Sequence, residues 1–285
     1  METKMASRDL SGKICIVTGA GSGLGKAMAI GLSAAGAKVA GIDINPDAAT
    51  ATAAEGGGNI TPIQCDITSQ DAVEAAISSI IKDMGGLNVL INCAGLGMSW
   101  IRRDYLTNRL NFWDTEPAKW QAVMDVNVRG AFLMGRTVAP YLMAQNQGRI
   151  VNVTTSLNTM IRGGNMPYGQ SKASLEAATA SWAEDFDVAG SAVTANVLVP
   201  GGAADTPMVP HESPYNREKL VKPEAMVAPA IFLASDDSEG VNSMRFLGRL
   251  WDPEASDQDN LKASGSPAAW PELAAAAGAG QPKTS

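Results

Sequence analysis

The chain has 285 residues, which is enough for one large α/β domain or two small ones, and no break in composition divides it. Its formal net charge of -7 at pH 7 argues against nucleic acid or an anionic membrane surface as a partner, so small molecules are the expected partners. No stretch approaches the length of a membrane span and residues 1–13 are polar and mixed in charge, so we expect a cytoplasmic protein.

Short apolar segments alternate with longer amphipathic or Ala-rich segments. Strands are predicted at 13–18, 38–42, 60–65, 88–92, 148–154 and 192–199, and helices at 24–35, 46–55, 69–84, 117–144, 167–189 and 223–235. Most strands are apolar on both faces, as parallel strands covered by helices must be. This pattern predicts a single-domain, doubly wound (Rossmann) α/β fold over residues 1–252 with helices on both faces of a parallel sheet. Residues 253–285 are rich in Ala, Gly and Pro, and are predicted to be a tail that is disordered or draped over a neighbouring surface.

A glycine-rich turn joins the first predicted strand to the first helix. Glycines let the backbone of such a turn approach a pyrophosphate, while the N–H groups of the helix point at it. The general spacing G-x-G-x-x-G does not fit when counting starts at Gly19, because Leu24 stands where the third glycine belongs. The spacing T-G-x-x-x-G-x-G fits fully from Thr18, and it predicts a dinucleotide site.

Asp43 closes the second predicted strand, 18 residues beyond Gly25, near the place where an acid binds the hydroxyls of the adenosine ribose. An acid there also repels a 2'-phosphate, by about 4 kcal/mol for two like charges about 4 Å apart at an effective dielectric near 20. No Arg or Lys lies between Thr18 and Leu24 to offset this repulsion. We therefore expect NAD rather than NADP, the alternative being that Asp43 is a simple solvated strand end.

The connection at 96–115 is long and begins at the end of a central strand, where ligands bind in open α/β sheets. Leu96, Met98 and Trp100 are candidates for one wall of a substrate pocket, in which aromatic side chains stack on an apolar substrate or one of the arginines of the loop pairs with an acidic one. The arginines of the loop are Arg102, Arg103 and Arg109. Packing of this loop against a second subunit is equally open.

Tyr168 and Lys172 are four residues apart on the predicted helix 167–189, so they share one face of it. A tyrosine ordinarily titrates near ~10, and lowering its pKa to about 7 requires roughly 4 kcal/mol of preferential stabilisation of the phenolate. A close cation in a partly dry cleft can supply that, so the pair predicts a general base.

Taken together these motifs resemble the short-chain dehydrogenase/reductase family. The resemblance extends over roughly the first 240 residues and rests on the glycine spacing and Tyr-x-x-x-Lys together with further short motifs in the expected order: Asp66, Asn92-Cys93-Ala94-Gly95, Asn127 and Pro200-Gly201. Each motif alone is weak, whereas all of them in order at predicted strand ends are specific.

The resemblance implies a catalytic set of Asn127, Thr155, Tyr168 and Lys172. Tyr168 exchanges the proton while hydride passes to or from the nicotinamide, and Lys172 lowers the pKa of Tyr168 and binds the nicotinamide ribose. Asn127 is expected to hold a water that connects Lys172 to solvent. Thr155 stands where the family usually has a serine and supplies the same hydroxyl, with Ser156 as the fallback if the strand end is shifted by one residue.

The resemblance also implies which residues hold the cofactor, at the glycine turn and at the strand ends: Gly19, Gly21, Ser22, Gly23, Leu24, Gly25, Asp43, Ile44, Asp66, Ile67, Asn92, Ala94, Gly95, Tyr168, Lys172, Pro200, Gly201 and Thr206. Thr206 comes one residue later than the commonest spacing. Residues 203–220 are expected to be a mobile lid, and residues 244–248 depart from the usual closing strand of the family.

Cysteine and histidine usage excludes other chemistry. The three cysteines, Cys15, Cys65 and Cys93, fall in apolar strand-like runs, where reduced cysteine behaves as a small hydrophobe. His211 is the only histidine, so no metal site is predicted. It is expected to be an exposed loop residue, and a tentative substrate contact within the lid.

The favoured function is an NAD-dependent alcohol dehydrogenase or ketone reductase, assembled as a homo-oligomer, a tetramer or dimer, through helices 117–144 and 167–189. Two alternatives stay open: a non-catalytic NAD-binding sensor or scaffold, and an epimerase or dehydratase that recycles the hydride. Net production of NADH from added alcohols separates the first from both others.

Overall fold

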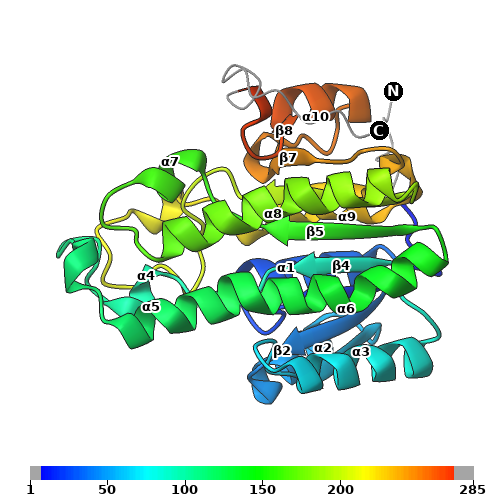
Figure 1. Cartoon of the computed structure of the whole chain (residues 1–285), viewed down its shortest axis with the longest axis horizontal. Coiled ribbons are helices and arrows are strands. Elements are labelled where there is room, and N and C mark those ends of the chain that lie inside the picture. The colour runs from blue at the N-terminus through cyan, green and yellow to red at the C-terminus, as the bar shows by residue number, and fades with distance from the viewer. Residues whose placement is uncertain (1–7, 273–285) are drawn as a thin grey trace.

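The computed structural model describes residues 8–272, in which one eight-stranded sheet lies between layers of helices (Figure 1). The strand order is β3-β2-β1-β4-β5-β6-β7-β8, with parallel pairing throughout except between β7 and β8. The strands are β1 (Ile14–Thr18), β2 (Lys38–Asp43), β3 (Ile60–Gln64), β4 (Val89–Asn92), β5 (Gly148–Val153), β6 (Val193–Val199), β7 (Met244–Leu247) and β8 (Gly265–Pro267). The predicted doubly wound fold is confirmed, and the chain changes direction across the sheet between β1 and β4.

Helices connect the parallel strands and cover both faces of the sheet. They are α1 (Gly23–Ala34), α2 (Pro46–Glu55), α3 (Gln70–Met84), α4 (Met98–Ile101), α5 (Pro117–Met124), α6 (Ala131–Ala144), α7 (Leu157–Ile161), α8 (Tyr168–Val188), α9 (Val227–Ala234) and α10 (Asp257–Ser264). Their starts follow local chemistry: the Asn45 side chain accepts hydrogen bonds from the N–H groups of Asp47 and Ala48, and Ser69 caps α3 in the same way. Within the described residues no helix combines the length and the apolar character needed to cross a membrane.

Two apolar cores hold the layers together. On one face α1 and α9 pack on the sheet through residues such as Met28, Leu32 and Phe232, which are fully or almost fully buried. On the other face, toward the viewer in Figure 1, α3, α6 and α8 pack through residues such as Ile77 and Met134. β1 and β6 are buried at every position, as the continuous apolar runs predicted.

The predicted helix 117–144 is interrupted where it passes the sheet. Between α5 and α6 the backbone takes a π-helical turn, Asp125–Gly130, and Asn127 lies inside it. A π turn inserts one extra residue and rotates the side chains that follow, so such turns are frequent at functional sites. The sequence prediction of one helix over 117–144 did not specify this turn.

The prediction that the tail beyond residue 252 is disordered is wrong for its described part, which instead packs on a neighbouring surface formed by the last strands of the sheet. Ser256 caps α10, and β8 then pairs antiparallel with β7, where Met244 lies opposite Pro267. Small residues make this packing possible. Ala268 packs against Val197 and Val199, and only 2% of it is exposed. Residues 273–285 lie outside the described residues. The unusual sequence at 244–248 nevertheless begins with a regular strand, β7, that pairs parallel with β6.

The long connection at 96–115 also has more structure than expected. It contains α4 and a short 3-10 turn, Phe112–Asp114. Met98, Ile101 and Leu110 are buried against Val123 of α5, so a small core of their own holds the loop in place.

Candidate active site

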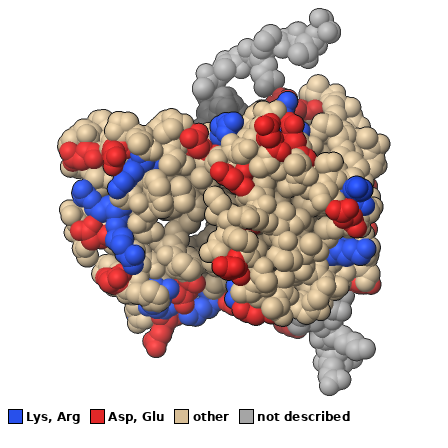
Figure 2. All heavy atoms as spheres, turned by 90° about the horizontal axis from the view of Figure 1, so that it is seen from below, with Lys and Arg blue, Asp and Glu red and all other residues tan. Residues whose placement is uncertain are grey.

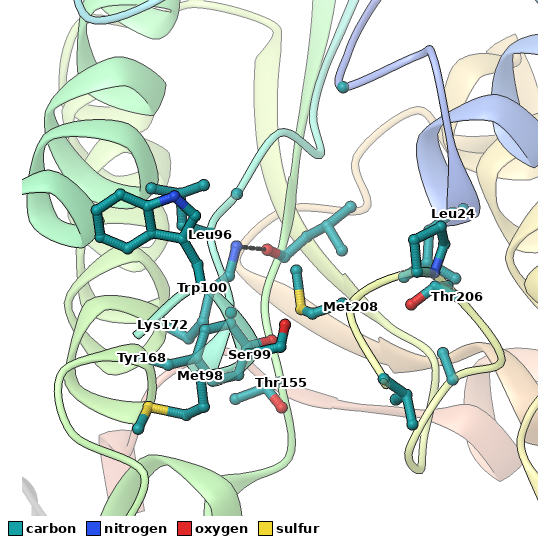
Figure 3. A pocket seen from close by; sticks show the side chains of 18 of the residues that line it. Leu24, Leu96, Met98, Ser99, Trp100, Thr155, Tyr168, Lys172, Thr206 and Met208 are labelled. Atoms are coloured by element: carbon teal, nitrogen blue, oxygen red, sulfur yellow. Dashed lines mark hydrogen bonds between the residues drawn. The ribbon is translucent and has the colours of Figure 1, made fainter. Parts of the chain in front are cut away.

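One cavity of about 1200 Å³ opens at the carboxyl ends of the parallel strands, at the point where the strand order reverses (Figure 3). It is larger than the about 300–1000 Å³ of most ligand pockets, so it has room for a dinucleotide and a second molecule. Most predicted site residues line it: Gly19, Ser22, Gly23, Leu24, Gly25, Asp43, Ile44, Asp66, Ile67, Ala94, Gly95, Leu96, Met98, Trp100, Thr155, Ser156, Tyr168, Lys172, Pro200 and Thr206. In Figure 3, Tyr168, Lys172 and Thr155 face Leu24 and Thr206 across the pocket.

Close approach explains the glycines of the turn before α1. Gly19 has φ +69°, and a Cβ there would lie 2.8 Å from the Cα of Ala94. Gly21 donates its N–H to Oδ2 of Asp43 at 2.9 Å, and a Cβ on Gly21 would meet Ala48 at 2.7 Å. The turn is therefore held against β2 and β4 with its backbone exposed to the cavity, as a pyrophosphate site requires.

Asp43 ends β2 at the edge of this turn. Its two oxygens accept N–H groups of Gly21 and Asn45, both at 2.9 Å, which fixes the carboxylate while leaving acceptor capacity for ribose hydroxyls. Three cations line the cavity within the described residues, Arg109, Arg162 and Lys172, and none of them is on the glycine turn or on the strand that Asp43 ends. The residues present therefore fit the adenosine ribose of a nicotinamide dinucleotide.

The predicted catalytic side chains meet at the other end of the cavity. Tyr168 begins α8, and its phenol lies near the Thr155 side chain, just beyond β5, at the same end of the cavity. Lys172, one turn further along α8 and 3% exposed, donates from Nζ to the Val153 carbonyl at 2.8 Å (dashed in Figure 3). The helix and the strand end thus bring an acid/base phenol, a hydroxyl donor and an ammonium to one place.

The pKa values run against the prediction from the sequence. Burial raises the pKa of Tyr168 to about 12, and the nearby Thr155 hydroxyl only partly opposes this shift. Burial likewise lowers the pKa of Lys172 to about 8. The expectation that Lys172 brings the pKa of Tyr168 below its ordinary value is therefore wrong here: desolvation of the phenolate dominates, and the ammonium is turned to a backbone carbonyl.

The choice between Thr155 and Ser156 has a local explanation. Ser156 caps α7, accepting the N–H of Thr159 at 3.2 Å and sharing a hydrogen bond with its hydroxyl at 2.7 Å. Its hydroxyl is thus occupied by the helix, whereas the Thr155 hydroxyl lies near the Tyr168 phenol at the cavity. The geometry favours Thr155 for the oxygen-holding role.

Asn127 is close to the cavity without lining it. Its Oδ1 accepts the N–H of Leu96 at 2.7 Å, and its Nδ2 donates to the Leu96 carbonyl at 3.0 Å and to the Ser171 hydroxyl at 2.9 Å. The amide therefore ties the loop after β4 to α8, beside Lys172. Its role in holding a water stays a prediction.

Four other predicted residues lie outside the cavity lining. Gly21 donates its N–H to Asp43, as described above. Asn92 is buried, and its Nδ2 donates a hydrogen bond to Oδ1 of Asn152 at 2.9 Å. Gly201 packs on Arg249, and His211 is exposed in a turn of the predicted lid. Asn92 and Gly201 thus shape the strand ends, and His211 is placed as its loop context predicted.

Sequence reasoning missed the segment between Ser156 and Tyr168. Asn158, Thr159, Arg162, Gly163, Gly164 and Asn165 all line the cavity, as do Met208 and Val209 in the predicted lid. The signal was present, because a segment that joins two site residues at one strand end has to pass the site. The lid lies over the glycine turn, since a Cβ on Gly23 would come within 3.0 Å of Thr206.

A buried polar network supports Thr155 from behind. Glu176 of α8 accepts a hydrogen bond from Thr154 at 2.8 Å and forms an ion pair with Arg245 of β7 at 3.4 Å. Arg245 in turn donates to the Thr155 carbonyl at 2.7 Å. The two charged side chains are 0% and 5% exposed, so the backbone at the end of β5 is fixed from inside the protein.

Comparisons with known proteins agree with this site. The family model described as short chain dehydrogenase matches residues 13–216. A 3-oxoacyl-[acyl-carrier-protein] reductase of Thermotoga maritima is 33% identical over 244 residues, 81% of this chain and 94% of that protein. A fluoren-9-ol dehydrogenase of Terrabacter is 29% identical over 262 residues, 85% of this chain and 72% of that protein.

Solved structures are similar over the same region. A 3-ketoacyl-(acyl-carrier-protein) reductase from Brucella melitensis, complexed with NADH, has a TM-score of 0.72 and 28% identity, and the match covers 82% of this chain and 95% of that one. A gluconate 5-dehydrogenase, assigned as NAD(P) dependent, from Beutenbergia cavernae with bound NADP has a TM-score of 0.71 and 26% identity, covering 85% and 96%. The resemblance read from the motifs is confirmed.

Proposed function

This chain belongs to the short-chain dehydrogenase family of oxidoreductases, and we propose that it interconverts a secondary alcohol and a ketone with NAD as the hydride carrier. The observation that carries the proposal is the placement of Tyr168, Thr155 and Lys172 at one end of a cavity whose other end is formed by the glycine turn and Asp43. A proton donor and a hydride carrier can therefore act on one carbonyl.

Each side chain has a role that follows from its surroundings. Tyr168 gives its proton to the oxygen of a ketone, or takes one from an alcohol, and Thr155 holds that oxygen by a hydrogen bond. Lys172, when protonated, carries a positive charge at this end of the cavity and would hold the nicotinamide ribose. The nicotinamide ring of NAD, when bound, supplies or accepts the hydride.

The preference for NAD rests on Asp43. The similar solved structures include one with NADH and one with NADP, so family membership leaves the choice open. A 2'-phosphate beside this carboxylate would lose about 4 kcal/mol, close to a thousandfold in affinity, and no lining cation on the glycine turn or β2 offsets it.

The test is a panel of secondary alcohols and their ketones scored by NADH absorbance. Wild-type protein is expected to turn over at least one pair, and Tyr168→Phe to lose nearly all turnover while NAD affinity stays within a few-fold. Tyr141→Phe is the matched control, because Tyr141 lies on α6 and does not line the cavity.

Substantial activity in Tyr168→Phe would refute the role of the phenol. Absence of net NADH production with every alcohol, together with tight NAD binding, would instead favour the sensor or the hydride-recycling alternatives. A homo-oligomer that packs through α6 and α8, and a cytoplasmic location, stay predictions.

A further inference from the structure

Charge is divided along the cavity. The two acidic residues that line it, Asp43 and Asp66, follow β2 and β3 at the adenosine end. At the opposite end, the loops after β4 and β5 contribute Arg109 and Arg162, and no acidic side chain of the described residues lines the cavity there. Figure 2 shows a hollow in this face of the molecule, with basic side chains interspersed with acidic ones to its left.

Arg109 is fixed against the segment that follows α7. A Cβ on Gly163 would lie 3.1 Å from its Cζ, and a Cβ on Gly164 would lie 2.9 Å from its Cγ. The two glycines, which directly follow Arg162 in the chain, therefore let the whole Arg109 side chain lie along this turn. Residues far apart in the sequence thus place two guanidinium groups at one rim of the cavity.

Arg162 faces the aromatic side of the same rim. Burial and the neighbouring Tyr215 phenol raise the pKa of Tyr105, whereas the charge of Arg162 lowers it. Tyr105 also packs with Tyr168 and Met98 in the small core of the loop. The path from Tyr168 to Arg162 is therefore lined by a phenol and apolar groups, which suits a short carbon chain between a carbonyl and a distant charge.

Neither arginine is neutralised by the protein. Within residues 8–272, Arg109 and Arg162 form no ion pair and donate no side-chain hydrogen bond, whereas Arg103 on the same loop pairs with Glu212 at 3.6 Å. Guanidinium groups present a planar fork that matches a carboxylate or a phosphate, and they keep their charge at every physiological pH.

We propose that the substrate is an anionic ketone or secondary alcohol, whose carboxylate or phosphate is bound by Arg109 and Arg162 while its carbonyl or hydroxyl meets Thr155 and Tyr168. This rests on the proposed function, which leaves the substrate class open. It makes Arg109 and Arg162 the specificity-determining residues, with Tyr105 and Tyr215 as the wall between the two groups.

The test compares anionic ketones with neutral counterparts of the same skeleton. The full-length protein with NADH is given acetoacetate and levulinate, each beside its methyl ester, and dihydroxyacetone phosphate beside dihydroxyacetone. The first two pairs report a carboxylate and the third a phosphate. In at least one pair, kcat/KM is expected to favour the anion by about tenfold or more, as charge-assisted hydrogen bonds to a fixed guanidinium permit.

Arg109→Gln with Arg162→Gln should remove that preference and leave NADH affinity unchanged. Arg103→Gln is the matched control, since its side chain is 79% exposed and lies outside the cavity lining. Binding is measured in parallel by quenching of tryptophan fluorescence in Tyr168→Phe protein, because Trp100 lines the cavity.

Equal turnover and equal binding of anions and neutral counterparts would overturn the proposal, as would a preference that survives the double substitution. If anions bind in an arginine-dependent way but no ketone is reduced, the anion site stands and the proposed function fails.

Discussion

The buried pair Glu176–Arg245 is predicted to position the active site at a cost in stability. The pKa of Glu176 is raised by burial although Arg245 and the Thr154 hydroxyl oppose the shift. The free energy lost when this carboxylate leaves water is therefore larger than the free energy gained from its partners. A pair with that balance contributes to the placement of Thr155 rather than to the net stability.

The magnitudes follow from the geometry. Arg245→Met leaves Glu176 buried without a counter-charge, and removal of one partner from a buried pair costs about 3–5 kcal/mol, a large part of the about 5–15 kcal/mol that stabilises a typical domain. Replacing the whole network, by Glu176→Met, Arg245→Met and Thr154→Val together, removes both charges and the hydroxyl that would lose its acceptor. The triple variant is expected to be more stable than Arg245→Met.

Catalysis should respond differently. The triple variant lacks the bond from Arg245 to the Thr155 carbonyl, so kcat is expected to fall by about tenfold or more even though the protein is folded. Denaturant unfolding gives the stability, and initial rates on the folded protein give kcat. Arg136→Met is the matched control, because its pair with Glu74 is half exposed and is expected to contribute at most about 1 kcal/mol.

Two results would refute this reasoning. A triple variant less stable than Arg245→Met would mean that the ion pair is itself a net stabilising interaction. A triple variant with the kcat of the wild type would mean that Arg245 does not position Thr155.

Three further predictions concern the cavity. Thr155→Ser should remain active, while Thr155→Val should lose about a hundredfold in kcat. Ser156→Ala should keep kcat within a few-fold but lower the unfolding free energy by about 1 kcal/mol, because the cap of α7 is lost. Loss of activity in Ser156→Ala alone would transfer the oxygen-holding role to Ser156. Asp43→Ser should narrow the ratio of kcat/KM for NAD over NADP, and a wild-type preference for NADP would contradict the argument from charge. Because the pKa of Tyr168 is raised to about 12, its phenolate becomes more abundant with each rise in pH, whereas Lys172, with a pKa lowered to about 8, keeps its charge only below that pH. Initial rates of alcohol oxidation should therefore increase from about pH 6 to about pH 8, while ketone reduction, which uses the phenol, stays nearly level. A fall in the oxidation rate over that range would exclude the phenol as the base.

Much of the fold could be predicted from the sequence because its local signals agree. Each strand predicted over residues 13–199 is present with its ends within one residue, since continuous apolar runs bounded by turn residues have few other solutions. The π turn at Asp125–Gly130 could not be predicted, because the residues around Asn127 are compatible with a regular helix and only the contacts to Leu96 and Ser171 select the turn. The final helix and strand were not predicted, because small residues such as Ala268 give no strong hydrophobic pattern in the sequence. Their packing depends on how their shape fits the neighbouring strands.

The site was predictable where chemistry is local and unpredictable where it depends on distant partners. The glycine turn, Asp43 and the spacing of Tyr168 and Lys172 are local patterns, and all of them lie at the cavity. Arg162 has no such pattern around it. Arg162 becomes a site residue only because the loop after β4 brings Arg109 to the turn that follows Arg162.

The direction of the Tyr168 pKa has the same origin. A spacing of four residues places Lys172 on the same face of α8, but it says nothing about what else the ammonium can bind or how dry the phenol is. The end of β5 supplies the Val153 carbonyl, which takes the ammonium at 2.8 Å, and the loop after β4 supplies the apolar residues that pack against Tyr168. Both effects favour the neutral phenol, since burial penalises the phenolate and the cation is directed elsewhere. A phenol that is held in its neutral form is suited to give a proton to a ketone oxygen, and for the same reason alcohol oxidation by Tyr168 is expected to depend on pH.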